Sequence, residues 1–250
     1  MTEPPYHDVT GSGPVLLLVP GGAGHPMGLG PLVDRLASRF TVVTYDPLGL
    51  AHGRLGQAVP DQRPADWSEG AHRVLDAVLP AGERAYAFGT SSGGVAVLDL
   101  LVRHPGRLAH VVAHEPPCVT VLPDGPERRE ELIAQLDGPG RPPAEGASAT
   151  PMGVFLAHVL RSFTAYLPGP GPDSGSGSGS GSGIPPRRLT VAAGAGSRGE
   201  LLYQTSELLA DRIGCPLVQF PGGHLGALEH PVEFADLLAD TLCSGGGDLP

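Results

Sequence analysis

Two adjacent serines of this 250-residue chain lie between glycines, in a pattern that is typical of a serine nucleophile. The segment Gly89-Thr90-Ser91-Ser92-Gly93 fits the pattern G-x-S-x-G, in which a sharp turn from a strand into a helix presents a serine hydroxyl as a nucleophile. Such a turn needs small flanking residues, because the backbone of the serine is held in a strained conformation. A tight turn with capping serines is the simpler alternative for the same five residues.

A serine nucleophile also needs a base and two donors for the oxyanion that forms on the attacked carbonyl. Pro20-Gly21-Gly22-Ala23-Gly24 follows an earlier predicted strand, and we expect the backbone N–H of Gly22 or Ala23, together with that of Ser92, to bind this oxyanion. His224 follows the last predicted strand and is the predicted base. A phosphate-binding loop is the alternative for the first segment, but the chain has neither GxxxxGK[ST] nor a complete GxGxxG with a trailing acid.

Alternating strands and helices are predicted to position these loops. The apolar or β-branched runs at 15–19, 41–45, 85–88, 108–113, 188–193 and 216–220 are typical of buried strands, and helical patterns separate them at 32–40, 69–79, 95–104 and 200–213, with a last helix at 231–242. This alternation predicts an α/β fold, in which a mostly parallel, doubly wound sheet has helices on both faces.

The alternation stops over residues 119–186, which are rich in Pro and Gly and contain helical patterns near 127–136 and 154–166. We interpret them as a cap inserted between two parts of the core, residues 1–118 and 187–243. Five consecutive Ser-Gly pairs at 174–183 form either a natural repeat or an engineered linker, and such a tract behaves as flexible coil. Residues 244–250 are predicted to be a disordered tail.

Several of these motifs, in this order on these elements, resemble the α/β-hydrolase fold family. The segment 20–24 resembles the oxyanion loop of that family, 44–53 the turn after its next strand, 89–94 its nucleophile turn and 221–226 its histidine loop. The resemblance covers roughly residues 13–118 and 189–242. It implies the α/β-hydrolase fold and a Ser, acid and His triad, and it leaves the substrate open.

The chain departs from the family pattern at the acid. The usual Asp follows the strand that ends here at Ala193, and its position looks like Gly196, which has no side chain. Glu115, one strand after the nucleophile, resembles the alternative acid position that some members use. Glu200 lies four residues after Gly196 and is predicted to be on the next helix, and a chain without any acid is the third possibility. We expect Glu115 to be the acid, with a loop carboxylate that caps local amides as its structural alternative.

Composition excludes several other classes. Sixteen basic residues against twenty-six acidic ones give a net charge of −10, which argues against a free-standing nucleic-acid binder. No uninterrupted apolar run approaches the ~18 residues of a membrane-spanning helix. The first residues do not read as a signal peptide, and the three cysteines are scattered, so a cytoplasmic protein with reduced thiols is expected. The sequence has no CxxC or HExxH, and we expect no metal site.

The sequence therefore predicts a serine hydrolase that acts on a small ester, thioester, lactone or amide through an acyl-enzyme on Ser91. His224 would take the serine proton, and Glu115 would orient His224. The expected partner is a small-molecule substrate, without a cofactor, and the sequence leaves the oligomeric state open. The alternatives are a catalytically weak or inactive member that binds a small molecule, and carbon–carbon bond cleavage or cofactor-free oxidation on the same scaffold. Other histidines, His25 and His110 among them, are expected to have solvated or capping roles.

Overall fold

The computed structural model describes residues 5–136, 149–169 and 183–246, and within them one sheet has the strand order β1-β3-β2-β4-β5-β6-β7. The strands are β1 (His7–Gly11), β2 (Val15–Val19), β3 (Thr41–Tyr45), β4 (Ala85–Thr90), β5 (Leu108–His114), β6 (Leu189–Gly194) and β7 (Leu217–Phe220). All neighbouring strands are parallel except β1 and β3, which are antiparallel. The predicted α/β fold with a mostly parallel sheet is confirmed.

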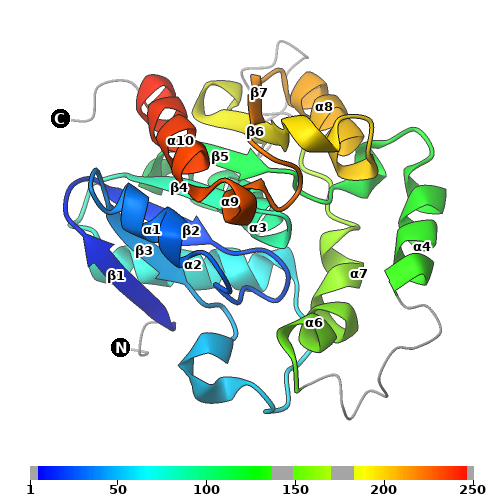
Figure 1. Cartoon of the computed structure of the whole chain (residues 1–250), viewed down its shortest axis with the longest axis horizontal. Coiled ribbons are helices and arrows are strands. Elements are labelled where there is room, and N and C mark those ends of the chain that lie inside the picture. Colours follow the sequence, from blue (N-terminus) through cyan, green and yellow to red (C-terminus); the bar gives the residue numbers. More distant parts are fainter. Residues whose placement is uncertain (1–4, 137–148, 170–182, 247–250) are drawn as a thin grey trace.

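Helices cover both faces of this sheet (Figure 1). One face is covered by α1 (Gly30–Leu36), α9 (Gly226–Glu229) and α10 (Pro231–Gly245), and the other by α2 (Pro64–Val78), α3 (Ser92–Arg103) and α8 (Leu201–Ile213). The inner strand β2 is apolar along its length because its side chains are buried on both sides. Leu16 and Leu18 belong to the core under α1 and α10, and Leu17 and Val19 belong to the core under α2 and α3. No helix in the described ranges is long and apolar enough to cross a membrane.

The middle of the chain lies beside the carboxyl edge of the sheet, where α4 (Gly125–Leu136), α6 (Pro151–Val154) and α7 (Leu160–Phe163) stand together in Figure 1. A π-helical segment, Phe155–Val159, joins α6 to α7. Phe163 packs on Trp67 of α2 with a ring-centroid distance of 4.7 Å, which attaches this region to the core. The limits 119–186 for a cap remain a prediction, and most of the Ser-Gly tract at 174–183 lies outside the described residues.

Two features differ from the sequence analysis. Strand β1 was not predicted, because it is short and mostly exposed and its pairing with β3 depends on residues thirty or more positions away. The predicted tail at 244–250 was wrong in its first residues, since α10 continues to Gly245. A Cβ at Gly245 would lie 2.3 Å from the ring of His110, so a glycine is needed where the helix end lies on this ring. Residues 247–250 lie outside the described part.

Candidate active site

The loops singled out in the sequence meet at the carboxyl edge of the sheet. Ser91 follows β4, Glu115 follows β5, and His224 lies in the loop after β7, while the segment 20–24 follows β2. Because these strands are parallel, their carboxyl ends face the same side. In open parallel sheets this edge is where ligands bind.

The turn at Ser91 has the strained geometry that the G-x-S-x-G pattern predicts. Ser91 has φ 53° and ψ −125°, a conformation that few residues other than glycine adopt, and its N–H donates to the carbonyl of His114 at 2.9 Å. A Cβ at Gly89 would lie 2.2 Å from the carbonyl oxygen of Gly93, and a Cβ at Gly93 would lie 2.0 Å from that of Val19. Only glycine therefore fits at positions 89 and 93. Helix α3 begins directly after Ser91.

A buried carboxylate touches the predicted base. Glu115 is fully buried (0 % exposed), and its Oε2 lies 2.8 Å from Nδ1 of His224. An ionised carboxylate can only accept hydrogen bonds, so Nδ1 carries the proton in this contact. In the neutral imidazole that leaves Nε2 as a proton acceptor, which is the state a general base needs.

Three groups hold the Glu115 carboxylate. In addition to His224, the N–H of Gly194 donates to Oε1 at 2.9 Å, and the hydroxyl of Ser197 donates to the same oxygen. Burial raises the pKa of Glu115, but the hydrogen bonds from His224, Ser197 and Gly194 outweigh burial and hold this pKa below its ordinary value. The carboxylate is therefore ionised at neutral pH, although it is shielded from water.

The other positions considered for the acid are not in contact with His224 in the described structure. Gly196 donates its N–H to the carbonyl of Gly222 at 2.7 Å and has no side chain to offer. Glu200 is exposed and lies at the beginning of α8. Ser197 was not predicted as a partner of the carboxylate. Its hydroxyl lies one residue after Gly196, the vacant Asp position, and this closeness could have indicated the contact.

The loop after β2 approaches the nucleophile closely. A Cβ at Gly21 would lie 2.9 Å from Cβ of Ser91, so glycine permits the approach. The hydroxyl of Ser92 donates to the carbonyl of Gly22 at 2.6 Å and ties the two loops together. Among the described groups none accepts a hydrogen bond from the N–H of Gly22, Ala23 or Ser92, the predicted oxyanion donors. Gly22 and Ala23 line the cavity beside Ser91, whereas Ser92 is buried directly behind the nucleophile.

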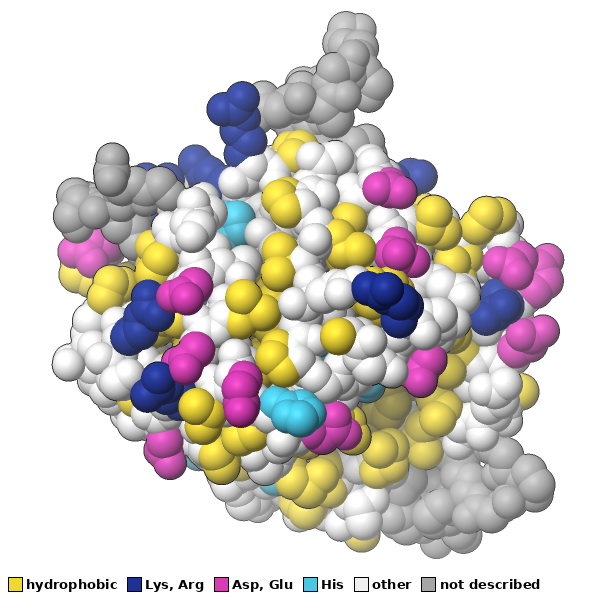
Figure 2. Space-filling view, turned by 45° about the horizontal axis from the view of Figure 1, so that its top comes forward, with side chains coloured by type: hydrophobic (Ala, Val, Ile, Leu, Met, Phe, Trp, Pro, Cys, Tyr) yellow, Lys and Arg dark blue, Asp and Glu magenta, His cyan; other side chains and the backbone are white. Residues whose placement is uncertain are grey.

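A cavity of about 430 Å³ lies over these loops, and both Ser91 and His224 line it. No hydrogen bond joins the two side chains in the described structure; without substrate this contact is often long. Most of the lining is apolar and comes from Met27, Leu29, Leu132, Leu136, Met152, Phe155, Leu160, Leu202, Leu225 and Leu228. Figure 2 shows hydrophobic side chains gathered around a hollow on this side of the molecule. No Asp, Glu, Lys or Arg is among the described residues that line the cavity.

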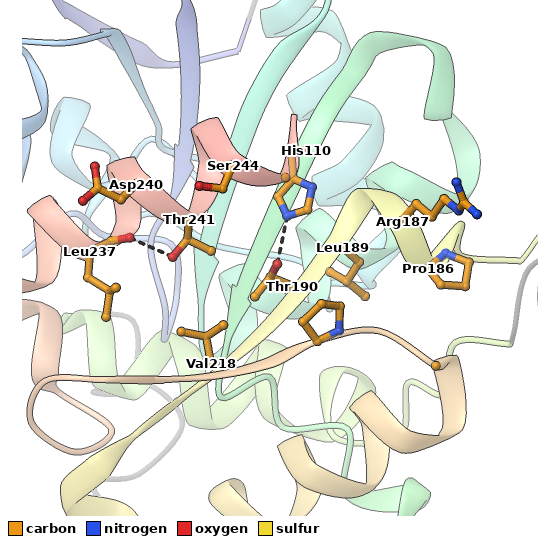
Figure 3. A pocket seen from close by; sticks show the side chains of 13 residues that line it. His110, Pro186, Arg187, Leu189, Thr190, Val218, Leu237, Asp240, Thr241 and Ser244 are labelled. Atoms are coloured by element: carbon orange, nitrogen blue, oxygen red, sulfur yellow. Dashed lines mark hydrogen bonds between the residues drawn. The ribbon is translucent and has the colours of Figure 1, made fainter. Parts of the chain in front are cut away.

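A second cavity, of about 600 Å³, lies toward the opposite, amino end of β5 and β6, beside α10 (Figure 3). Its most buried polar group is His110, whose Nε2 lies 2.9 Å from Oγ1 of Thr190. The solvated or capping role expected for His110 was wrong: the side chain is 2 % exposed because β5 lies inside the sheet and α10 covers it. Burial lowers the pKa of His110 to about 4. The described lining has no carboxylate–histidine pair beside a nucleophile, so the first cavity is the candidate site.

A family model for the alpha/beta hydrolase family matches residues 16–237 of the chain. The chain belongs to the alpha/beta hydrolase family. The resemblance seen in the sequence is thereby confirmed. Within this family the chain is 30% identical over 254 residues to an uncharacterized hydrolase of Bacillus subtilis (strain 168), YraK, and the match covers 95% of this chain and 92% of that protein.

Solved structures of other proteins show the same fold. A thermophilic esterase from Thermogutta terrifontis is 18% identical, with a TM-score of 0.66 over 96% of this chain and 93% of the esterase. Est816, described as an N-acyl homoserine lactone degrading enzyme, is 21% identical, with a TM-score of 0.61 over 94% of this chain and 95% of that one. At these identities the likeness shows the fold alone. A shared fold does not fix the function, which depends on the residues of the site.

Proposed function

We propose that this alpha/beta hydrolase is a serine hydrolase that cleaves a small, apolar ester, thioester, lactone or amide through an acyl-enzyme on Ser91. The observation that carries the proposal is the 2.8 Å contact between Nδ1 of His224 and the buried carboxylate of Glu115, at a cavity that Ser91 also lines. A carboxylate, an imidazole and a strained serine at one edge of the sheet are the parts that acyl transfer needs.

In the first step, Oγ of Ser91 attacks the carbonyl carbon of the substrate, and Nε2 of His224 takes the hydroxyl proton. The carbonyl oxygen becomes an oxyanion, which accepts hydrogen bonds from the N–H of Ser92 and of Gly22 or Ala23. His224 then gives its proton to the leaving alcohol, thiol or amine, and the acyl group remains on Ser91. Water, activated by the same imidazole, releases the acid and restores the serine.

Glu115 acts through His224 in both steps. Its carboxylate keeps the proton of the neutral ring on Nδ1 and stabilises the imidazolium that forms when Nε2 is protonated. The alternative of an inactive binding protein was motivated by the missing Asp at Gly196. Because a buried and ionised carboxylate reaches His224 from another strand, we favour the enzyme.

The character of the cavity supports an apolar, uncharged substrate. Its described lining has no charged Asp, Glu, Lys or Arg, and exposed Met27 (68 %) and Met152 (62 %) extend the apolar surface to its edge. A substrate that bears a carboxylate or an ammonium group would lose its hydration there without gaining a partner. The activities named for the esterase and for the lactone-degrading Est816 agree with a carboxylic ester or lactone.

Hydrolysis of p-nitrophenyl butyrate, followed by p-nitrophenolate release, tests this proposal. Ser91→Ala should lower kcat by about 10⁴-fold or more, because the covalent path is lost. Ser38→Ala is the matched control, since this exposed hydroxyl donates only to the carbonyl of Arg35 and should leave the rate unchanged. A Ser91→Ala protein that hydrolyses the ester at the wild-type rate would overturn the proposal.

A further inference from the structure

One polar side chain in the candidate cavity has no role in the steps above. Besides the nucleophile and the base, the described lining has three side chains that can form hydrogen bonds: Thr90, Thr164 and His25. Oγ1 of Thr164 donates to a backbone carbonyl at 2.7 Å, and Oγ1 of Thr90 lies 3.4 Å from the ring of His114. Within the described ranges the ring of His25 has no hydrogen-bond partner.

The two ring nitrogens of His25 have different surroundings. The side chain is half-buried, and Nδ1 is completely buried with no partner, whereas Nε2 is not among the buried atoms. A buried N–H without an acceptor is rarer, and less well tolerated, than an unpaired acceptor. The neutral ring therefore places its proton on Nε2. His25, for which a solvated or capping role was predicted, therefore presents an N–H donor to the candidate cavity.

We propose that His25 is a specificity-determining residue, whose Nε2–H donates a hydrogen bond to a second oxygen of the substrate, away from the carbonyl that Ser91 attacks. The preferred substrates are then apolar esters or lactones that carry one more uncharged acceptor, such as a ketone, ether or hydroxyl oxygen. This inference rests on the proposed serine hydrolase activity and narrows its substrate class.

The position of His25 in the chain agrees with this role. It follows the predicted oxyanion loop directly, so it is fixed relative to the place where the attacked carbonyl must lie, and its own carbonyl accepts from the N–H of Met27 at 2.8 Å. A single N–H donor among apolar side chains suits an uncharged oxygen, because no Lys or Arg is among the described residues that line the cavity. A substrate without the oxygen leaves the N–H unpaired after water is displaced, and sites of this kind discriminate strongly against such analogues.

Matched esters measure this preference. One series is p-nitrophenyl hexanoate and its analogues in which an ether oxygen or a ketone replaces one methylene of the acyl chain. The other is hexyl butyrate and its analogues with the same replacements in the alcohol part, followed by acid release. Each kcat/KM is divided by the rate constant of the same ester with hydroxide, which removes differences in intrinsic reactivity. We expect at least one oxygenated ester to exceed its hydrocarbon twin by about tenfold in the wild type.

Four variants test whether His25 causes the preference. The amide nitrogen of Gln reaches the place of Nε2, so His25→Gln should keep most of the tenfold ratio. His25→Asn, whose amide reaches only the place of Nδ1, and His25→Phe should reduce the ratio to about one. His7→Phe is the control, because His7 is on the edge strand β1 and does not line the cavity, and it should keep the full ratio. Melting temperatures of all variants show that each is folded.

The outcomes separate this inference from the proposed function. Labelling of wild-type Ser91 by a fluorophosphonate, read by intact mass, reports the nucleophile independently of His25. The inference alone would be overturned in two cases. In the first, Ser91 is labelled but the wild type hydrolyses no oxygenated ester faster than its hydrocarbon twin. In the second, Ser91 is labelled and the preference remains in folded His25→Phe. No labelling and no hydrolysis of either series would overturn the proposed function and the inference together.

Discussion

Glu115→Gln removes one negative charge from a fully buried side chain and leaves its size almost unchanged. The Gln carbonyl can still accept from the N–H of Gly194 and the hydroxyl of Ser197, so this side of the contact is kept. On the other side an amide N–H₂ replaces the oxygen that accepts from His224. Two donors would then face each other, and the imidazole would have to move its proton to Nε2.

Two contributions determine the expected loss in kcat: the lost charge interaction with the imidazolium and the wrong tautomer of the neutral ring. The charges of a carboxylate and an imidazolium whose nearest atoms are 2.8 Å apart have centres about 4 Å apart, which at an effective dielectric constant near 20 is worth about 4 kcal/mol. The wrong tautomer adds about 1.4 kcal/mol if only one ring in ten has a free Nε2. The sum corresponds to a loss of about 10⁴ in kcat, which is also the loss seen when the acid of serine protease triads is neutralised.

The assay is steady-state hydrolysis of p-nitrophenyl butyrate by the wild type and by Glu115→Gln. Thermal unfolding of both proteins shows whether the variant is folded. Glu115→Gln combined with Ser91→Ala should be no slower than Ser91→Ala alone, because residues that act as one unit are not additive. A folded Glu115→Gln protein whose kcat stays within tenfold of the wild type would refute the assignment of Glu115 and the electrostatic reasoning behind it.

Other predictions concern the surroundings of this carboxylate and the buried histidines. Gly196→Asp should not raise kcat, since Glu115 already serves His224 and a Cβ there would lie only 3.2 Å from the Gly222 carbonyl; a large rise in kcat would show that the native acid is ineffective. Ser197→Ala should lower kcat by about tenfold, because one donor to the ionised carboxylate is lost, and a shift of the acidic limb of the pH–rate profile to higher pH should accompany it. Burial lowers the pKa of His110 and His114 to about 4, so below pH ~6.5 the unfolded chain binds protons that the native chain does not. The free energy of unfolding should then fall as the pH drops from about 6.5 to 4, by about 2 kcal/mol for each histidine at pH 5. In His110→Gln only His114 remains, so denaturant unfolding should show about half of the combined loss of the wild type.

The sequence was sufficient for the parallel strands of the sheet and for the order of its loops, but not for β1. Residues 15–19 had to be a strand buried on both faces, because they form an uninterrupted apolar run, and the structure places them inside the sheet, between β3 and β4. The glycines beside Ser91 were a steric requirement of the turn, and the distances from Gly89 and Gly93 to neighbouring backbone show the same requirement. Patterns of this kind are local, so a single segment is enough to reveal them.

Features that depend on distant parts of the chain were missed. The segment around His25 does not indicate that a cavity forms over it, because residues more than a hundred positions later, such as Met152 and Phe155, form the other wall of that cavity. The pairing of Ser197 with Glu115 joins the ends of two neighbouring strands, and the local sequence showed only that the usual Asp was absent. The end of α10 was placed too early because its glycines resemble a stop signal, whereas in the fold Gly245 lies against His110.

Covalent labelling shows whether Ser91 is an activated nucleophile. The wild-type protein and Ser91→Ala are each treated with a fluorophosphonate, and the intact mass of each is measured. We expect one adduct on the wild type and none on Ser91→Ala, since only a serine with a working base and oxyanion donors reacts. No adduct on a folded wild-type protein, or an equal adduct on Ser91→Ala, would contradict this expectation.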